Sequence, residues 1–131
     1  MTRKELKEKK LKEEKEFIES IKGELIDSKT KDRFRSTTVW KLFRDKFKNR
    51  VDPVSLKKLP KRWQLHHCCL DPREYTNLKM DNFEAVNGTV HDLLHYLYSI
   101  YRKDKQVLKR IKKILDKMDR LNNGKDIRDF K

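Results

Sequence analysis

The run WQLHHCCL, residues 63–70, is short and largely apolar and lies between Pro60 and Pro72. A run of this kind predicts a β-strand. The following residues 71–82 are expected to form a loop, and residues 83–87 predict a second short strand.

The second strand is expected to lead into a helix. Asn87-Gly88 is typical of a tight turn, and Thr89 after it is expected to act as the N-cap. Apolar residues then recur at helical spacing: Val90, Leu94, Leu97, Tyr98 and Tyr101. The predicted order over residues 61–101 is therefore strand, loop, strand, helix.

Helical sequence precedes this central part of the chain. Residues 2–28 predict a helix rich in Lys and Glu whose first half has little to bury. A polar break at residues 27–31 leads to a second predicted helix at 37–49. Residues 52–61 contain two prolines and are expected to hold no long element.

A last helix is predicted from Lys105 to Leu121, ended by Asn122-Asn123-Gly124. Its apolar stripe is expected to be buried, either in the core or in a homodimer: Val107, Leu108, Ile111, Ile114, Leu115, Met118 and Leu121. The basic side chains on another face are candidates for contact with nucleic-acid phosphates: Lys109, Lys113, Lys117 and Arg120.

Composition limits the class of protein. The 131 residues suit one domain, 35% are hydrophobic against 43% charged, and only 3 Gly and 3 Pro interrupt the chain. These values predict a mainly helical α+β protein and argue against a large enclosed small-molecule pocket. The sequence has no apolar run of about 18 residues, as a membrane span needs, so we expect a soluble intracellular protein that binds no membrane.

Charge is distributed unevenly along the chain. The net charge is +14, and residues 1–50 hold 17 basic and 10 acidic side chains, against 6 and 6 in residues 51–100 and 12 and 5 in residues 101–131. A surplus of this size favours a polyanionic partner, with nucleic acid as the leading candidate. The neutral centre contains all four histidines and both cysteines.

The histidines have the spacing of a metal site. His91 and His95 are four residues apart on a predicted helix, so one helix face carries both imidazoles, and His66 can supply a third ligand. His67 then remains, with an ordinary pKa of about 6.5 that suits a general base. Because neighbours on a strand point to opposite faces, a bulge or the strand's end is needed at this dipeptide.

The sequences LHH at 65–67 and DNF at 81–83, together with His91 and His95, resemble the HNH, or ββα-metal, nuclease motif. The additional His95 makes the pattern similar to the nuclease domains of colicin-type bacteriocins. The resemblance covers about 35 residues and implies a metal-dependent DNA endonuclease that leaves 5′-phosphate and 3′-hydroxyl ends. It also implies a ββα-metal finger. We expect this finger, at residues 61–101, to lie in one domain of residues 1–131, between a basic helical extension at 1–60 and a basic helix at 102–131, and neither flank carries the resemblance.

The resemblance assigns roles residue by residue. It makes His66, His91 and His95 the metal ligands, His67 the general base, and Asn82 the residue that braces the loop and orients the base. Fifteen residues separate His67 from Asn82 and nine separate Asn82 from His91, which suits the family. Many members also bind a structural zinc through two CxxC pairs, whereas here the only cysteines, Cys68 and Cys69, are adjacent and are expected to be reduced and structural.

One divalent ion is the expected cofactor. Three neutral imidazoles favour Zn²⁺, Ni²⁺ or Co²⁺ for tight binding, whereas Mg²⁺ or Mn²⁺ could support turnover. DNA is the expected partner, with RNA left open, in the cytoplasm of a bacterium or a phage-infected host. The alternative is a non-catalytic zinc protein that binds nucleic acid, and a third interpretation is a basic protein that neutralises an acidic partner. Trp40 and Trp63 are expected to fill the core rather than to stack on bases.

Overall fold

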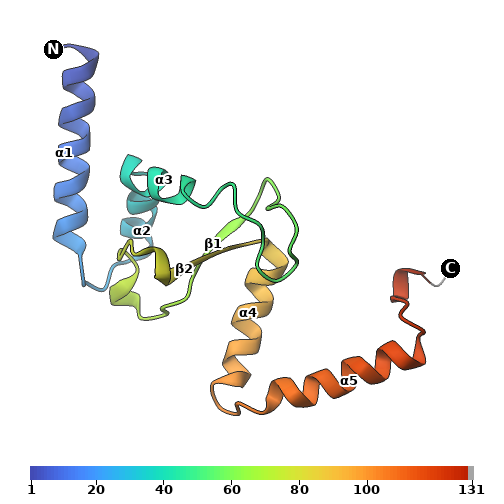
Figure 1. Ribbon diagram of the computed structural model, residues 1–131. Coiled ribbons are helices and arrows are strands. Elements are labelled where there is room, and N and C mark those ends of the chain that lie inside the picture. The colour runs from blue at the N-terminus through green and yellow to red at the C-terminus, as the bar shows by residue number, and fades with distance from the viewer. Residues whose placement is uncertain (130–131) are drawn as a thin grey trace. The chain divides into compact units, whose positions relative to one another are not determined.

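The computed structural model describes residues 1–129, which contain five α-helices, three 3₁₀ turns and one two-stranded antiparallel sheet (Figure 1). This mainly helical composition with a small sheet confirms the predicted α+β class. The helices and strands are α1 (Arg3–Ile21), α2 (Ser28–Arg35), α3 (Thr38–Asp45), β1 (Gln64–His67), β2 (Phe83–Val86), α4 (Gly88–Tyr101) and α5 (Val107–Leu121). The 3₁₀ turns are η1 (Pro72–Glu74), η2 (Met80–Asn82) and η3 (Ile127–Asp129).

The chain divides into two compact units, Met1–His91 and Asp92–Lys131. The boundary lies inside the continuous helix α4, so the predicted finger at residues 61–101 spans it. The first unit contains α1, α2, α3, both strands and the start of α4. The second contains the remainder of α4 together with α5 and η3.

The first predicted helix is shorter than expected. It ends at Ile21, close to Gly23, whose φ of +74° is a left-handed conformation that favours glycine. The predicted break through residue 31 is wrong, because α2 begins at Ser28. The Asp27 carboxylate accepts the Thr30 N–H at 2.8 Å, so a residue typical of loops here serves as an N-cap.

The helix predicted at 37–49 is shorter in the structure, where α3 covers Thr38–Asp45. Side chains fix its start. The Thr37 hydroxyl accepts the Trp40 N–H at 3.2 Å, and the Glu14 carboxylate of α1 accepts the Thr38 N–H at 2.9 Å. These bonds satisfy N–H groups that a helix leaves unpaired in its first turn. They also join α1 to α3.

An aromatic core fills the first unit. Its buried residues come from α2, α3, the segment after them and β2: Phe34, Trp40, Phe43, Phe47, Leu59, Trp63, Phe83 and Ala85. The rings of Phe43 and Phe83 lie edge to face with centroids 5.1 Å apart, a favourable arrangement. Trp40 and Trp63 are only 7% and 8% exposed, which confirms that both fill the core.

The sheet forms where the sequence predicted its two strands. Gln64–His67 pairs with Phe83–Val86 in antiparallel register, with His66 opposite Glu84 and His67 opposite Phe83. Phe83, Ala85 and Val86 are buried, so β2 anchors the sheet on the core. The intervening segment contains η1 and η2, and residues 52–61 hold no helix or strand, as expected.

The junction between β2 and α4 differs from the prediction. Asn87-Gly88 was expected to form a tight turn, with Thr89 as the helix cap. Instead α4 begins at Gly88, and the Asn87 side chain accepts the Val90 N–H at 2.9 Å. Because Asn is among the best N-cap residues, the strand can pass into the helix without an intervening turn.

The alternative in which the apolar stripe of α5 is buried in the core is wrong. None of its residues is buried, and Ile114, Leu115, Met118 and Leu121 are each more than half exposed. The described part of the second unit, residues 92–129, has no buried residue of its own. Among the helices described, none combines the length and the apolarity that a membrane crossing requires.

Candidate metal centre

Three histidines from β1 and α4 lie close together. His66, His91 and His95 each offer one ring nitrogen, and these nitrogens lie within 4.8 Å of one another. The rings of His66 and His91 are 5.2 Å apart at an angle of 76°. His95 follows His91 by about one turn of the same helix. The three residues that the resemblance assigns as ligands are therefore together.

The donors in this cluster suit a borderline-soft divalent ion. Imidazole nitrogen binds Zn²⁺, Ni²⁺ and Co²⁺ well, and three protein ligands leave a coordination position for water or substrate. The Nδ1 atoms of His66 and His91 are buried, whereas the His95 residue is exposed. The three side chains are thus suitable ligands for such an ion.

His67 lies among aromatic rings. Its ring stacks on Tyr75 at 4.6 Å and 13°, lies parallel to Trp40 at 6.3 Å and contacts Phe83 at 4.7 Å. Its Nε2 lies 3.2 Å from the Tyr75 carbonyl oxygen. A carbonyl can only accept, so this bond places the imidazole proton on Nε2 and leaves Nδ1 of the neutral ring as a proton acceptor.

The surroundings of His67 favour its neutral form. Burial lowers the pKa of His67 below its usual value of 6.5, and the positive charges of Lys31 and Arg35 lower it further, against the opposing effect of the Tyr75 carbonyl. At neutral pH the ring is therefore ready to take a proton.

The strand's end resolves the question of how His66 and His67 reach one region. His67 is the last residue of β1, and it lines a surface hollow of about 370 Å³ together with His91. His66 lies beside His91. His91 is thus the residue that the three-histidine cluster and the hollow have in common.

Asn82 braces the loop before β2. Its side-chain NH₂ donates to the Asn77 carbonyl at 3.3 Å. Its backbone carbonyl accepts the N–H of Cys68, the residue after His67, at 2.6 Å. His67 Nε2 donates its orienting hydrogen bond to the Tyr75 carbonyl. Asn82 therefore makes its side-chain hydrogen bond within the loop rather than with the histidine.

Sequence reasoning missed Asp52, which organises the start of α4. This carboxylate is 1% exposed and accepts the N–H groups of Val54 and Ser55 and, at 2.8 Å, of Asn87. Asn87 in turn caps α4 and accepts the His91 N–H at 2.9 Å. Asp52 begins the segment 52–61, which contains two prolines and was predicted to hold no long element. Only the tendency of Asp to accept hydrogen bonds from nearby N–H groups could have suggested its role.

We expect Asp52→Asn to lower the free energy of unfolding by about 1–3 kcal/mol at pH 7, because an amide NH₂ would face a buried N–H donor. Burial acts to raise the pKa of Asp52, but the N–H donors of Asn87, Ser55 and Val54 outweigh it and lower that pKa. The contribution of the Asp52 carboxylate to folding stability is therefore present above the ordinary carboxyl pKa. It is lost as the pH falls through the lower pKa that Asp52 has in the folded protein.

Urea unfolding of the wild type and of Asp52→Asn at pH 7 and pH 3 measures this effect. The difference between the two proteins should shrink at pH 3. Asp45→Asn, a change at an exposed carboxylate, is the matched control. Equal stability of the two variants at pH 7 would contradict the assignment.

The other residues singled out in the sequence, four basic residues and two cysteines, do not belong to the histidine cluster. Lys109, Lys113, Lys117 and Arg120 are all exposed on α5. Cys68 and Cys69 are both free thiols, and Cys68 is exposed, so its side chain does not fill the core.

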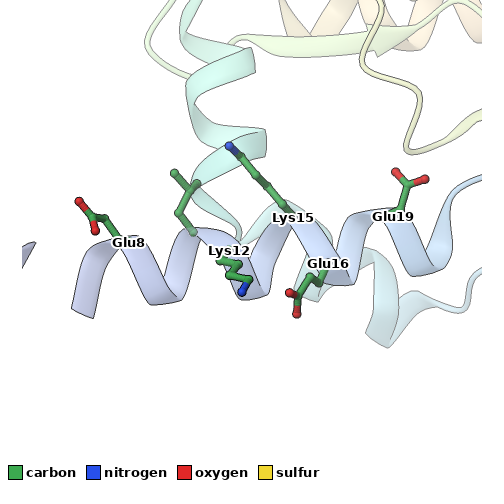
Figure 2. A pocket seen from close by; sticks show the side chains of 6 residues that line it. Glu8, Lys12, Lys15, Glu16 and Glu19 are labelled. Atoms are coloured by element: carbon green, nitrogen blue, oxygen red, sulfur yellow. The ribbon is translucent and has the colours of Figure 1, made fainter. Parts of the chain in front are cut away.

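A second hollow, of about 430 Å³, runs along α1 (Figure 2). Only α1 contributes to its lining, with Leu11 and alternating acidic and basic side chains: Glu8, Lys12, Lys15, Glu16 and Glu19. Such a set is typical of a solvated helix surface. It contains none of the candidate residues.

The chain was also compared with known proteins. No protein-family model, no curated protein and no solved structure matches it.

Proposed function

We propose that this protein is a metal-dependent endonuclease that hydrolyses phosphodiester bonds of DNA through a ββα-metal finger of the HNH type. One observation carries the proposal: His67, with Nδ1 left as acceptor, shares a hollow with His91, which belongs to the three-histidine cluster. A proton acceptor beside a metal-capable cluster is the combination that hydrolysis of a phosphodiester needs.

Each histidine has a role in the proposed reaction. His66, His91 and His95 would hold a divalent ion, which would supply positive charge to offset the negative charge of the phosphate. His67 Nδ1 takes a proton from a water molecule whose oxygen attacks phosphorus. The bond from phosphorus to the 3′ oxygen breaks, and that oxygen takes a proton from solvent water. The Tyr75 carbonyl keeps the His67 ring oriented throughout. The products are a 5′-phosphate and a 3′-hydroxyl.

A plasmid-nicking assay tests the proposal. Purified protein with Mg²⁺, Mn²⁺, Zn²⁺, Ni²⁺ or Co²⁺ should convert supercoiled DNA to the open circle, and excess chelator should stop the reaction. The nicks should be sealed by DNA ligase, because they carry 5′-phosphate and 3′-hydroxyl ends. If the protein bound metal and DNA but none of these ions supported nicking, the result would instead favour the non-catalytic zinc protein.

The basic face of α5 is expected to hold the DNA backbone. Replacing Lys109, Lys113 and Lys117 with Gln should flatten the dependence of log affinity on log salt by up to about 2.7, since each neutralised phosphate contributes about 0.9. Fluorescence anisotropy with a labelled duplex in the presence of chelator measures the slope. Three equivalent changes on α1, at Lys4, Lys7 and Lys15, form the control, and an unchanged slope in the α5 variant would exclude this face.

A further inference from the structure

Two guanidinium groups border the hollow beside His67, and the proposed hydrolysis assigns them no role. Arg35, at the end of α2, and Arg44, on α3, line this hollow together with His67 and His91. The remaining lining residues are neutral: Trp40, Trp63, Gln64, Leu65 and Tyr75. Of the described residues that line the hollow, none is acidic, so its lining carries a net positive charge.

Arg44 is held in place by Trp63. Its guanidinium carbon lies 3.8 Å from the centre of the Trp63 ring, and its Nη2 donates to the Trp63 carbonyl at 2.8 Å. Stacking on an aromatic ring is a favourable position for arginine. The carbonyl uses one of the five N–H donors of the side chain, and the others can serve a ligand.

Arg35 is held on the aromatic stack that contains His67. Its Nη1 donates to the Tyr75 hydroxyl at 3.1 Å, and the Tyr75 ring stacks on His67. Asp32 pairs with the other terminal nitrogen of Arg35, but this carboxylate is largely exposed, where ion pairing is weak. The positive charge of Arg35 therefore lies beside the aromatic stack that contains His67.

We propose that this hollow is a binding site for one phosphodiester group of a nucleic acid, with Arg35 and Arg44 donating hydrogen bonds to its oxygens. Arginine suits this ligand because its planar fork matches two phosphate oxygens. The site does not require the metal. The identification of the ligand as nucleic acid, rather than another phosphate compound, rests on the proposed function and on the net charge of +14.

The chain provides its own probe for this site. Its only two tryptophans, Trp40 and Trp63, both line the hollow, so intrinsic fluorescence reports on what binds there. The experiment titrates the full chain with dithymidine monophosphate, which has one phosphodiester, in buffer with excess chelator. We expect a saturable change in emission, a similar change with the uridine dinucleotide, and none with thymidine.

Variants then assign the binding to the two arginines. Arg35→Gln and Arg44→Gln should each raise the Kd for the dinucleotide about tenfold, as expected when a charge-assisted hydrogen bond is lost. Lys41→Gln, the same change of charge at an exposed position on α3, should alter it less than about twofold. Arg44→Lys keeps the positive charge, so its Kd should lie between those of the wild type and Arg44→Gln. This variant separates loss of binding from loss of folding.

Three results would overturn the inference. They are the absence of a saturable change in the wild type, equal affinities in the Gln variants and Lys41→Gln, and tighter binding of a phosphoserine peptide than of the dinucleotide. Because chelator is present, the titration is independent of cleavage. Dinucleotide binding without plasmid nicking would refute the proposed hydrolysis and support the phosphodiester site. Nicking without dinucleotide binding would refute the phosphodiester site and support the hydrolysis.

Discussion

Replacing His67 with alanine is expected to slow DNA cleavage by about 10²- to 10⁴-fold, the usual cost of removing a positioned proton acceptor. His67 is the proposed base because its Nε2 is bonded to the Tyr75 carbonyl and its Nδ1 is left to accept. It is not one of the three clustered histidines. Binding of metal and of DNA should therefore persist in the variant, and initial nicking rates compared with titration calorimetry measure the two effects separately.

His67 also packs between rings, so its removal could disturb the core. His67→Gln provides the control, because glutamine can still donate to the Tyr75 carbonyl but cannot act as a base near neutral pH. This variant should unfold at a temperature close to that of the wild type and should remain inactive. Nicking at the wild-type rate by either variant would refute the assignment of His67 as the base.

The sheet and the histidine cluster were the most predictable parts of this protein. Two short apolar runs separated by a polar loop predicted β1 and β2, and a spacing of four residues placed His91 and His95 on one helix face. Both patterns are local. The sequence alone could therefore bring the proposed ligands together once the two strands were assumed to pair.

Two of the wrong helix boundaries, the starts of α2 and α4, have a common cause. Asp27 and Asn87 are residue types that favour turns and helix caps alike, and both were interpreted as turn formers. In the structure each accepts an N–H three residues ahead and starts a helix. The choice between turn and cap depends on whether the following residues pack as a helix, which the side chain itself does not determine.

The supporting residues were not predictable because their partners are distant in sequence. Asp52 bonds to Asn87, 35 positions away, and Arg35 to Tyr75, 40 positions away. Arg44 and Trp63 are 19 positions apart. Charge and composition indicated a polyanionic partner, but only the packing of α2 and α3 on the sheet brings two arginines to the hollow beside His67.

The second large effect is expected at His91. His91→Ala should weaken binding of Zn²⁺, Ni²⁺ or Co²⁺ by more than about a hundredfold, since loss of a residue that only supports a ligand already costs about 10- to 100-fold. His91 is one of three proposed ligands whose ring nitrogens all lie within 4.8 Å of one another. Titration calorimetry on chelator-stripped protein should give one site per chain in the wild type.

Cysteine is the competing source of ligands, because Cys68 and Cys69 follow His67 directly and both are free. A double change of these residues to Ser should leave transition-metal affinity within about threefold, since neither belongs to the histidine cluster, whereas His95→Ala should resemble His91→Ala. If the Ser variant lost the metal and His91→Ala kept it, the thiols would be the ligands. The proposed hydrolysis at His67 would then lose its metal, since His91 is the residue that joins the cluster to the hollow.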